Sequence, residues 1–132
     1  MAGLSLFDIS GRAMAAQLVR LNTTASNMAN GGAVAGSEAG AFRALKPVFE
    51  TVGDRNGATV RVATIAAAGP AATKRHDPSH PLADANGDIW EANVDQAQEL
   101  VEMIEASRQY QNNVQVFDTA KTLTLDTLRI GQ

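Results

Sequence analysis

The C-terminal segment of this chain, residues 107–132, carries a helical pattern that continues almost to the last residue. It contains no proline, and Gly131 is its only glycine. The pattern begins upstream near Val94, so a helix over residues 94–130 would be about 55 Å long at about 1.5 Å per residue. Chain ends usually fray because few contacts hold them. A patterned helix of this length therefore needs a surface to pack on.

Two apolar stripes run along this predicted helix. The first follows 3-4 spacing through Leu100, Met103, Ser107, Tyr110, Val114, Phe117, Lys121, Thr124 and Leu128. The second consists of Val116, Ala120, Leu123 and Ile130. One helix of the same chain would cover only one stripe, and exposed apolar surface on this scale marks an interaction site. The second stripe therefore predicts contact with another chain.

The N-terminal segment predicts a second long helix. Phe7, Met14, Leu21 and Met28 recur every seven residues, with Leu4, Gly11, Leu18 and Ala25 three residues before each. This is the a/d pattern of a helix that pairs with another. Ser5, three residues before Asp8, is a helix start signal. Residues 30–32, Asn-Gly-Gly, predict its end, with a glycine in the left-handed cap conformation.

Between the helices the sequence predicts a flexible linker and a β-rich segment. Residues 31–41 are nearly all Gly, Ala and other small residues. The stretches FRALKPVFETV and ATVRVATIA carry strand-type residues, and residues 54–57 between them end in Asn-Gly, which favours a hairpin turn. Pro78 and Pro81 exclude a helix over residues 76–81. Another Asn-Gly turn, at residues 86–87, precedes a short predicted strand at Ile89 and Trp90, and Trp90 is expected to anchor a small local core.

The predicted fold class is therefore mainly α with a small β insertion. The long terminal helices are expected to pair as a coiled-coil-like layer. The segments are residues 1–30 for the N-terminal helix, 31–41 for the linker, 42–93 for the β-rich part and 94–132 for the C-terminal helix. Hydrophobic residues make up 45% of the chain but aromatic residues only 5%, and many of the rest are alanine. Thin cores with close helix contacts are expected.

Composition excludes several classes of protein. A net charge of −3 without a basic stripe argues against nucleic-acid binding. The chain has no cysteine, which excludes disulfides and thiolate metal sites. No apolar run approaches roughly 18 residues, so no membrane span is predicted. The N-terminus lacks a basic region followed by an apolar core, so no cleaved signal peptide is expected.

No catalytic, cofactor-binding or metal-ligating residue is predicted, and no small-molecule substrate. His76 and His80 are the only histidines, and the proline between them prevents a helical zinc pair. Asp84, Asn86 and Asp88 lack the glycine and glutamate that a calcium loop requires, and a hairpin turn explains them better. The glycines of residues 31–40 form no phosphate-binding motif.

Three stretches resemble the flagellar axial proteins, the family of rod, hook and hook-associated subunits. LNTTASNMAN at residues 21–30 is similar to the Asn-containing motif near the N-terminus of these proteins. SRQYQNNVQVFDTAKTLTLDTLRIG at residues 107–131 resembles their C-terminal signature. DPSHPLADANG, followed by IWEANV, over residues 77–94 is similar to the segment before the last helix of one rod subunit. This middle match and the short chain favour a proximal-rod member of the family.

The resemblance implies a structural subunit that catalyses no reaction and polymerises into the tubular drive shaft of the bacterial flagellum. It implies helices that order on assembly, with copies of the same chain and other rod subunits as partners, at the MS-ring and export-gate end of the basal body. It also implies location in the periplasm-spanning rod after type III export without a cleaved signal. The predicted assembly interface comprises Leu4, Phe7, Met14, Leu18, Leu21, Met28, Leu100, Met103, Tyr110, Val114, Phe117, Leu123, Leu125, Leu128 and Ile130.

Within this set, the N-terminal helix residues are expected to bury against the C-terminal helix of the same chain. Leu123, Leu125, Leu128 and Ile130 are expected to contact neighbouring subunits. Alternatives are another rod or hook subunit, a helical export adaptor or chaperone, and, more remotely, a metal enzyme built on His76 and His80.

Overall fold

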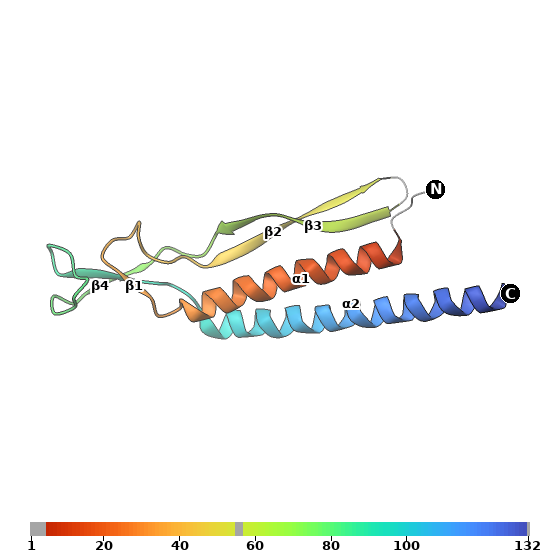
Figure 1. Cartoon of the computed structure of the whole chain (residues 1–132). Coiled ribbons are helices and arrows are strands. Elements are labelled where there is room, and N and C mark those ends of the chain that lie inside the picture. The colour runs from red at the N-terminus through yellow and green to blue at the C-terminus, as the bar shows by residue number, and fades with distance from the viewer. Residues whose placement is uncertain (1–4, 55–56, 132) are drawn as a thin grey trace.

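The computed structural model describes residues 5–54 and 57–131 and shows an elongated molecule dominated by two long helices (Figure 1). The elements are α1 (Leu6–Ala29), β1 (Val34–Ala35), β2 (Leu45–Asp54), β3 (Gly57–Ala67), β4 (Thr73–His76), β5 (Asp88–Glu91) and α2 (Gln96–Ile130). A mainly helical chain with a β-rich middle is therefore confirmed. None of the helices in the described part of the chain has the length and apolar character needed to cross a membrane.

Helix α1 is the middle layer of the molecule. It packs against the hairpin β2–β3 on one side and against α2, which runs antiparallel to it, on the other (Figure 1). Helix α2 packs mainly on α1, and its Glu99 and Glu102 line a groove together with Leu45 and Phe49 of β2. The sheet β1-β5-β4 lies at the end of the molecule where α1 finishes and α2 begins. The long axis is therefore set by the helices and the hairpin together.

The helix ends follow local signals in the sequence, with one correction. The predicted start of α1 is confirmed, because Ser5 and Asp8 form a reciprocal capping box. Helix α1 ends at Ala29, but the expected left-handed glycine is wrong, because neither Gly31 nor Gly32 has a positive φ. Asn30 caps the helix at φ −101°, and its side chain donates to the Ser26 carbonyl. An added Cβ at Gly31 would meet the exposed and flexible Gln96 side chain, with 2.9 Å to its amide nitrogen.

The predicted hairpin is confirmed. Strands β2 and β3 pair antiparallel from Leu45 opposite Ala67 to Asp54 opposite Gly57. The residues between Asp54 and Gly57, which carry the predicted turn, lie outside the described part. A register shift between Val48 and Phe49 marks a bulge. The hairpin thus runs alongside most of α1 as one continuous ribbon (Figure 1).

The small sheet is built on β5. The predicted strand at Ile89 and Trp90 is confirmed, and β5 pairs with β4 on one side and with β1 on the other. The sequence carries no signal for β1, because two residues in a small-residue segment show no alternation. Ile89 is fully buried. Trp90, the expected anchor, is only half-buried, with the Lys74 Nζ atom 5.7 Å from its ring centroid.

The turn before β5 is held by a carboxylate. The Asp84 Oδ1 atom accepts hydrogen bonds from the backbone N–H groups of Asn86 and Asp88, at 2.8 and 2.9 Å. Gly87 between them has φ +77°, a conformation that side chains disfavour. The predicted turn is therefore confirmed, with Asp84 in the role of an Asx-turn residue rather than a calcium ligand.

Asp88 links β4 to β5 through its buried side chain. The Lys74 Nζ atom lies 2.6 Å from one carboxylate oxygen, and the His76 Nδ1 atom lies 2.9 Å from the other. The hydrogen bond from Lys74, followed by that from His76, holds the pKa of Asp88 below its ordinary value of 3.8. The charged carboxylate therefore stabilises the small sheet.

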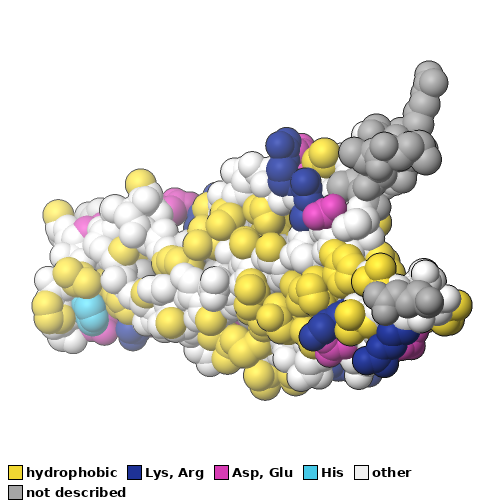
Figure 2. Space-filling view, turned by 45° about the vertical axis from the view of Figure 1, so that its right-hand side comes forward, with side chains coloured by type: hydrophobic (Ala, Val, Ile, Leu, Met, Phe, Trp, Pro, Cys, Tyr) yellow, Lys and Arg dark blue, Asp and Glu magenta, His cyan; other side chains and the backbone are white. Residues whose placement is uncertain are grey.

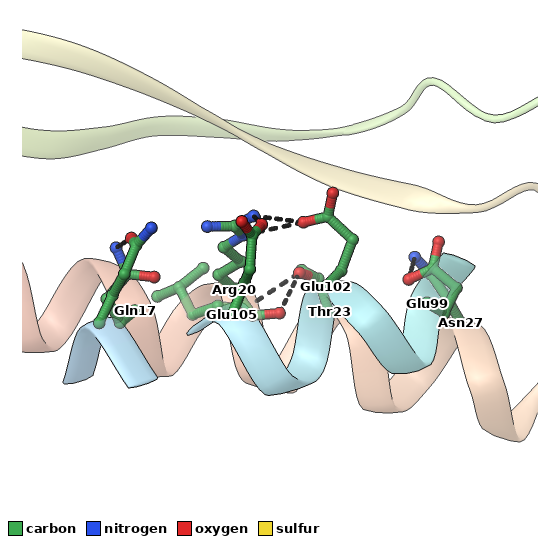
Figure 3. A network of polar contacts seen from close by, with 9 residues as sticks. Gln17, Arg20, Thr23, Asn27, Glu99, Glu102 and Glu105 are labelled. Carbon is green, nitrogen blue, oxygen red and sulfur yellow. Dashed lines mark hydrogen bonds and ion pairs between the residues drawn. The ribbon is translucent and has the colours of Figure 1, made fainter. Parts of the chain in front are cut away.

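Asn27 joins the three long elements to one another. Its side chain is 1% exposed, and its amide nitrogen donates to the Leu45 carbonyl at 2.9 Å. The same nitrogen lies 3.1 Å from the Glu99 carboxylate, and the Asn27 oxygen accepts from the Leu45 N–H at 2.7 Å. A side chain of α1 thereby pairs with the first residue of β2 and with the first turn of α2. Figure 3 shows Asn27 beside Glu99.

We expect the stability of the protein to depend on the charge of Asp88. Because its pKa is lowered in the folded state, its contribution is complete above the ordinary value of 3.8 and is lost as the pH falls through the lowered pKa. Urea unfolding at about pH 5 and about pH 3 should show a larger loss of stability for the unmodified protein than for Asp88→Asn. Asp118→Asn, on the exposed part of α2, should behave like the unmodified protein. Equal losses in all three would contradict this role.

Replacing Asn27 should destabilise the whole chain. Asn27→Ala leaves the Leu45 backbone groups and the buried Glu99 carboxylate without a partner, and unsatisfied buried polar groups cost about 1–3 kcal/mol each. We expect the free energy of unfolding in urea to fall by roughly 3 kcal/mol. Asn22→Ala, an exposed asparagine of the same helix, should change it by less than about 0.5 kcal/mol. Similar effects of the two substitutions would be inconsistent with the proposed contacts.

Candidate assembly interface

The face of α2 that packs on α1 follows the predicted stripe only in part. The buried and half-buried positions of this helix are Glu99, Glu102, Met103, Ala106, Ser107, Tyr110, Asn113, Val114, Phe117 and Ala120. Met103, Ser107, Tyr110, Val114 and Phe117 belong to the predicted stripe. Leu100, however, is 47% exposed, whereas Glu99 beside it is 8% exposed. Between residues 100 and 117, Leu100 is thus the one member of the predicted stripe that lies outside this face.

Polar contacts account for this difference. The Arg20 guanidinium of α1 pairs with Glu102, with its Nε atom 3.1 Å from the carboxylate, and approaches Glu105 at 3.3 Å. The Gln17 amide donates to the Gln109 side-chain oxygen at 2.9 Å. Together with Asn27 and Glu99, these pairs follow one line along the two helices (Figure 3). The seam between α1 and α2 is thus polar along much of its length.

Aromatic rings close the other end of the seam. Phe7 and Phe117 meet edge to face, with ring centroids 5.0 Å apart and planes at 73°. Met14, Leu21 and Met28 are half-buried along α1. The expected burial of Leu18 is wrong, because this side chain is 47% exposed. Leu4 lies outside the described residues.

The reason for the exposure of Leu18 is that α1 has two neighbours instead of one. Its most buried residues are small or polar: Ser10, Ala16, Thr23, Thr24 and Asn27. The helix as a whole packs on both the hairpin and α2. The seam positions occupied by Leu18 and Ala25 point away from both neighbours and are exposed. A heptad pattern predicts one buried stripe, so it does not predict that a helix is covered on two sides.

The C-terminal part of α2 extends past the start of α1. Phe117 lies against Phe7, near the first residue of α1, so residues 121–130 project about 15 Å further (Figure 1). We call residues 121–130 the overhang. All ten are exposed. They include Leu123 at 60%, Leu125 at 47%, Leu128 at 63% and Ile130 at 87% exposure.

The overhang is apolar on opposite sides. At about 100° per residue, Leu123 and Ile130 lie on one side of the helix, and Leu125 and Leu128 lie on the other. A helix with apolar residues on two opposite sides is stable when other elements cover both of them. Burying one such side chain is worth roughly 1.5–3 kcal/mol. No element among the described residues covers the overhang.

Exposed apolar side chains also occur elsewhere on the two helices. Leu6, Val101 and Ile104 are 48%, 60% and 53% exposed and were not among the predicted interface residues. Hydrophobic side chains gather over a broad area in the middle of the face shown in Figure 2. A groove next to the start of α1 is lined by Leu6, Asn112, Gln115, Val116 and Thr119. These residues could have been predicted from the sequence by considering the apolar side chains on every face of each helix.

The two histidines have structural contacts in this fold. His76 pairs with Asp88, and the His80 Nδ1 atom accepts a hydrogen bond from the Leu82 N–H at 3.1 Å. Within residues 5–54 and 57–131, no three His, Asp or Glu side chains are arranged to hold a metal ion. The exposed apolar surface of the helices is suited to association with another protein surface.

Comparison with known proteins identifies the family. Residues 7–31 match the family described as flagella basal body rod protein, and residues 85–130 match the flagellar basal body rod FlgEFG protein C-terminal family. The chain is 42% identical over 134 residues to the flagellar basal-body rod protein FlgC of Salmonella typhimurium, and both chains are covered completely. It is 44% identical to the protein of that name from Yersinia enterocolitica, again over the full length of both.

A more distant relative of the same name, from Buchnera aphidicola subsp. Schizaphis graminum, is 35% identical over the full length of both chains. The resemblance read from residues 21–30, 77–94 and 107–131 is therefore confirmed, and the export adaptor and metal enzyme are not favoured. This chain belongs to the family of flagellar basal-body rod proteins FlgC.

Proposed function

We propose that this chain is a structural subunit of the proximal rod of the bacterial flagellum, which polymerises through its terminal helices and catalyses no reaction. The relatives are named flagellar basal-body rod proteins. The observation that carries the proposal is the overhang, whose four large apolar side chains are 47–87% exposed. Such a surface is costly for a single copy in water and favourable in a polymer that covers it.

The contacts between subunits are proposed to be heterologous. The overhang of one subunit packs on a different surface of its neighbour, which allows a helical tube to grow. Leu123, Leu125, Leu128 and Ile130 are placed in this contact, with the exposed Leu18 and Leu100 as further contact residues. Each contact is modest, but a tube repeats it around and along its axis. The paired helices then form a coiled-coil-like inner layer.

The seam residues are proposed to hold each subunit together inside this layer. Phe7, Met14, Leu21 and Met28 pack toward Met103, Tyr110, Val114 and Phe117, and Leu4 is assigned to the same set. Neutral polar side chains such as Gln109, Asn112 and Gln115 hydrogen-bond across helices without the cost of burying charge. Asn27 ties the hairpin to both helices, so torque on the helices is passed to the β-rich part.

The proposed location is the periplasm-spanning rod of the basal body, reached by type III export without a cleaved signal. The proposed partners are copies of this chain, other rod subunits and the MS-ring and export-gate end of the basal body. Nucleic acid and small-molecule substrates have no role in the proposal. A polymer of this kind needs specific side surfaces on the subunit and no reactive site.

Substituting a charge in the overhang should block assembly. Leu128→Asp places a carboxylate where a neighbour would bury an apolar side chain, at a cost of several kcal/mol. We expect export and solubility to be retained, and incorporation into basal bodies and motility in soft agar to be lost. Thr122→Asp, an exposed polar position on the same helix, tests whether a new charge alone is harmful. Normal rods with Leu128→Asp would rule out this interface assignment.

Truncation after Ala120 should have the same outcome by a different route. It removes the overhang but keeps Phe117 and Ala120, the last residues of the seam with α1. Far-ultraviolet circular dichroism should show a folded chain, while purified basal bodies should lack it. Incorporation of the truncated chain at the normal level would show that the overhang has no part in assembly.

A further inference from the structure

A groove runs along the flank of the molecule between helix α1 and strand β3, and we call it the α1–β3 groove. Its volume is about 240 Å³, and the residues that line it are Arg12, Ala15, Ala16, Val19, Val60, Arg61 and Val62. Five of these residues are alanine or valine, and the two that carry a charge are arginines. No residue of α2 contributes to the lining, so this groove is separate from the seam between the helices.

The charge of the α1–β3 groove is purely positive. Arg61 pairs with Glu50 of β2, whereas the exposed Arg12 forms no ion pair with another residue in the described ranges 5–54 and 57–131. Two other grooves differ in this respect. The groove between β2 and α2 balances two cations with two glutamates, and the groove next to Leu6 has no charged lining. The α1–β3 groove therefore suits an apolar surface that carries a carboxylate.

One side of the overhang has this composition. At about 100° per residue, Leu123 and Ile130 lie together, and Asp126 lies within about 60° of both. The opposite side carries the other two leucines together with Lys121 and Arg129. Asp126 approaches Arg129 only at 4.0 Å, and both side chains are more than half exposed, so this pair contributes little. The carboxylate therefore remains available to a cation of another chain.

We infer that the side of the overhang formed by Leu123, Asp126 and Ile130 packs in the α1–β3 groove of a second copy of this chain. The aliphatic side chains cover the alanines and valines of the groove, and the Asp126 carboxylate lies beside the Arg12 guanidinium. The opposite side of the overhang is excluded, because its cations would meet the two arginines. This inference rests on the proposed function and names the surface that receives the overhang there.

The occupant has to be a different copy, because the groove is out of reach of the overhang of its own chain. Gln17 pairs with Gln109 across the seam, and Ala16 of the groove is next to Gln17. The groove is therefore level with about residue 110 of α2. The middle of the overhang lies about 17 residues, or about 25 Å, further along this helix. Two copies that point the same way are thus offset by about 25 Å along their helices, in a contact that repeats from copy to copy.

Cysteine cross-linking in assembled rods tests this contact, because the chain has no cysteine of its own. Ala15→Cys places a thiol in the groove, and Leu123→Cys places one on the inferred side of the overhang. The two variants are produced together, each with its own epitope tag, in cells without the unmodified chain. Purified basal bodies are then treated with a mild oxidant, and the disulfide-linked species that carry both tags are measured relative to the total of each chain.

Linked pairs should form between the overhang and the groove. A disulfide requires two Cα atoms within roughly 7 Å, so Leu123→Cys should link to Ala15→Cys at least about tenfold more than to Ile104→Cys. Ile104 is the matched control, because it is 53% exposed on α2 and lies outside the groove. Val62→Cys, a second groove position on β3, should link to Leu123→Cys as well.

A charge exchange tests the pairing of Arg12 with Asp126. Adding Asp126→Arg to the Leu123→Cys chain brings like charges together, and the amount of linked pairs should fall several-fold. Adding Arg12→Asp to the Ala15→Cys chain should then restore it, because the two charges have changed places. A loss of packing alone would not be repaired by the second substitution.

Four results would overturn the inference. These are equal linkage at Ile104→Cys, basal bodies that contain both variants without linked pairs at either groove position, linkage of Leu123→Cys to another rod subunit in place of a second copy, and failure of the charge exchange to restore linkage. All four are measured in basal bodies that have incorporated the chain, so they leave the proposed function intact. The proposed function fails separately, if Leu128→Asp or the truncated chain still forms normal rods.

Discussion

The arrangement of this molecule depends on the side chain of Asn27. Its amide makes two hydrogen bonds to the backbone of Leu45 and one to Glu99, and it is 1% exposed. A carboxamide offers a donor and an acceptor at the spacing of a peptide group, so Asn27 can act as a strand partner from within a helix. Asn27 thereby ties α1 to the hairpin and to the start of α2 at a single point.

From this point the two helices continue as a seam of small and polar side chains. Ala16, Ala106 and Ala120 are among the few buried hydrophobic residues, and Arg20 with its glutamates occupies the centre of the seam. Small residues allow close approach but bury little apolar area. The larger aliphatic side chains are left outside, most of all in the overhang. In the proposed rod, neighbouring subunits cover these outer side chains.

Local signals predicted the elements well. Ser5 with Asp8 marked the start of α1, the strand-type residues on either side of residues 54–57 marked the hairpin, and Asp84 to Gly87 marked the turn before β5. The same signals failed to predict which side chains are buried, because contacts between distant segments of the chain determine this. Leu18 was expected in the seam because its spacing fits a heptad, but α1 is covered on two sides and Leu18 lies on neither. The sequence does not predict Glu99 in the seam. Nothing around a single glutamate indicates that an asparagine 72 residues earlier will pair with it.

The sequence by itself determined that the chain has two long helices around a β-rich middle, and that its ends resemble those of rod subunits. Periodicity and turn chemistry are local, and short motifs can be recognised without a fold. Only the tertiary structure decided which face of each helix is turned inward, where β1 pairs, and that the end of α2 extends beyond α1. These features depend on hydrogen bonds and ion pairs between residues far apart in the chain, and their energies exist only once the elements meet.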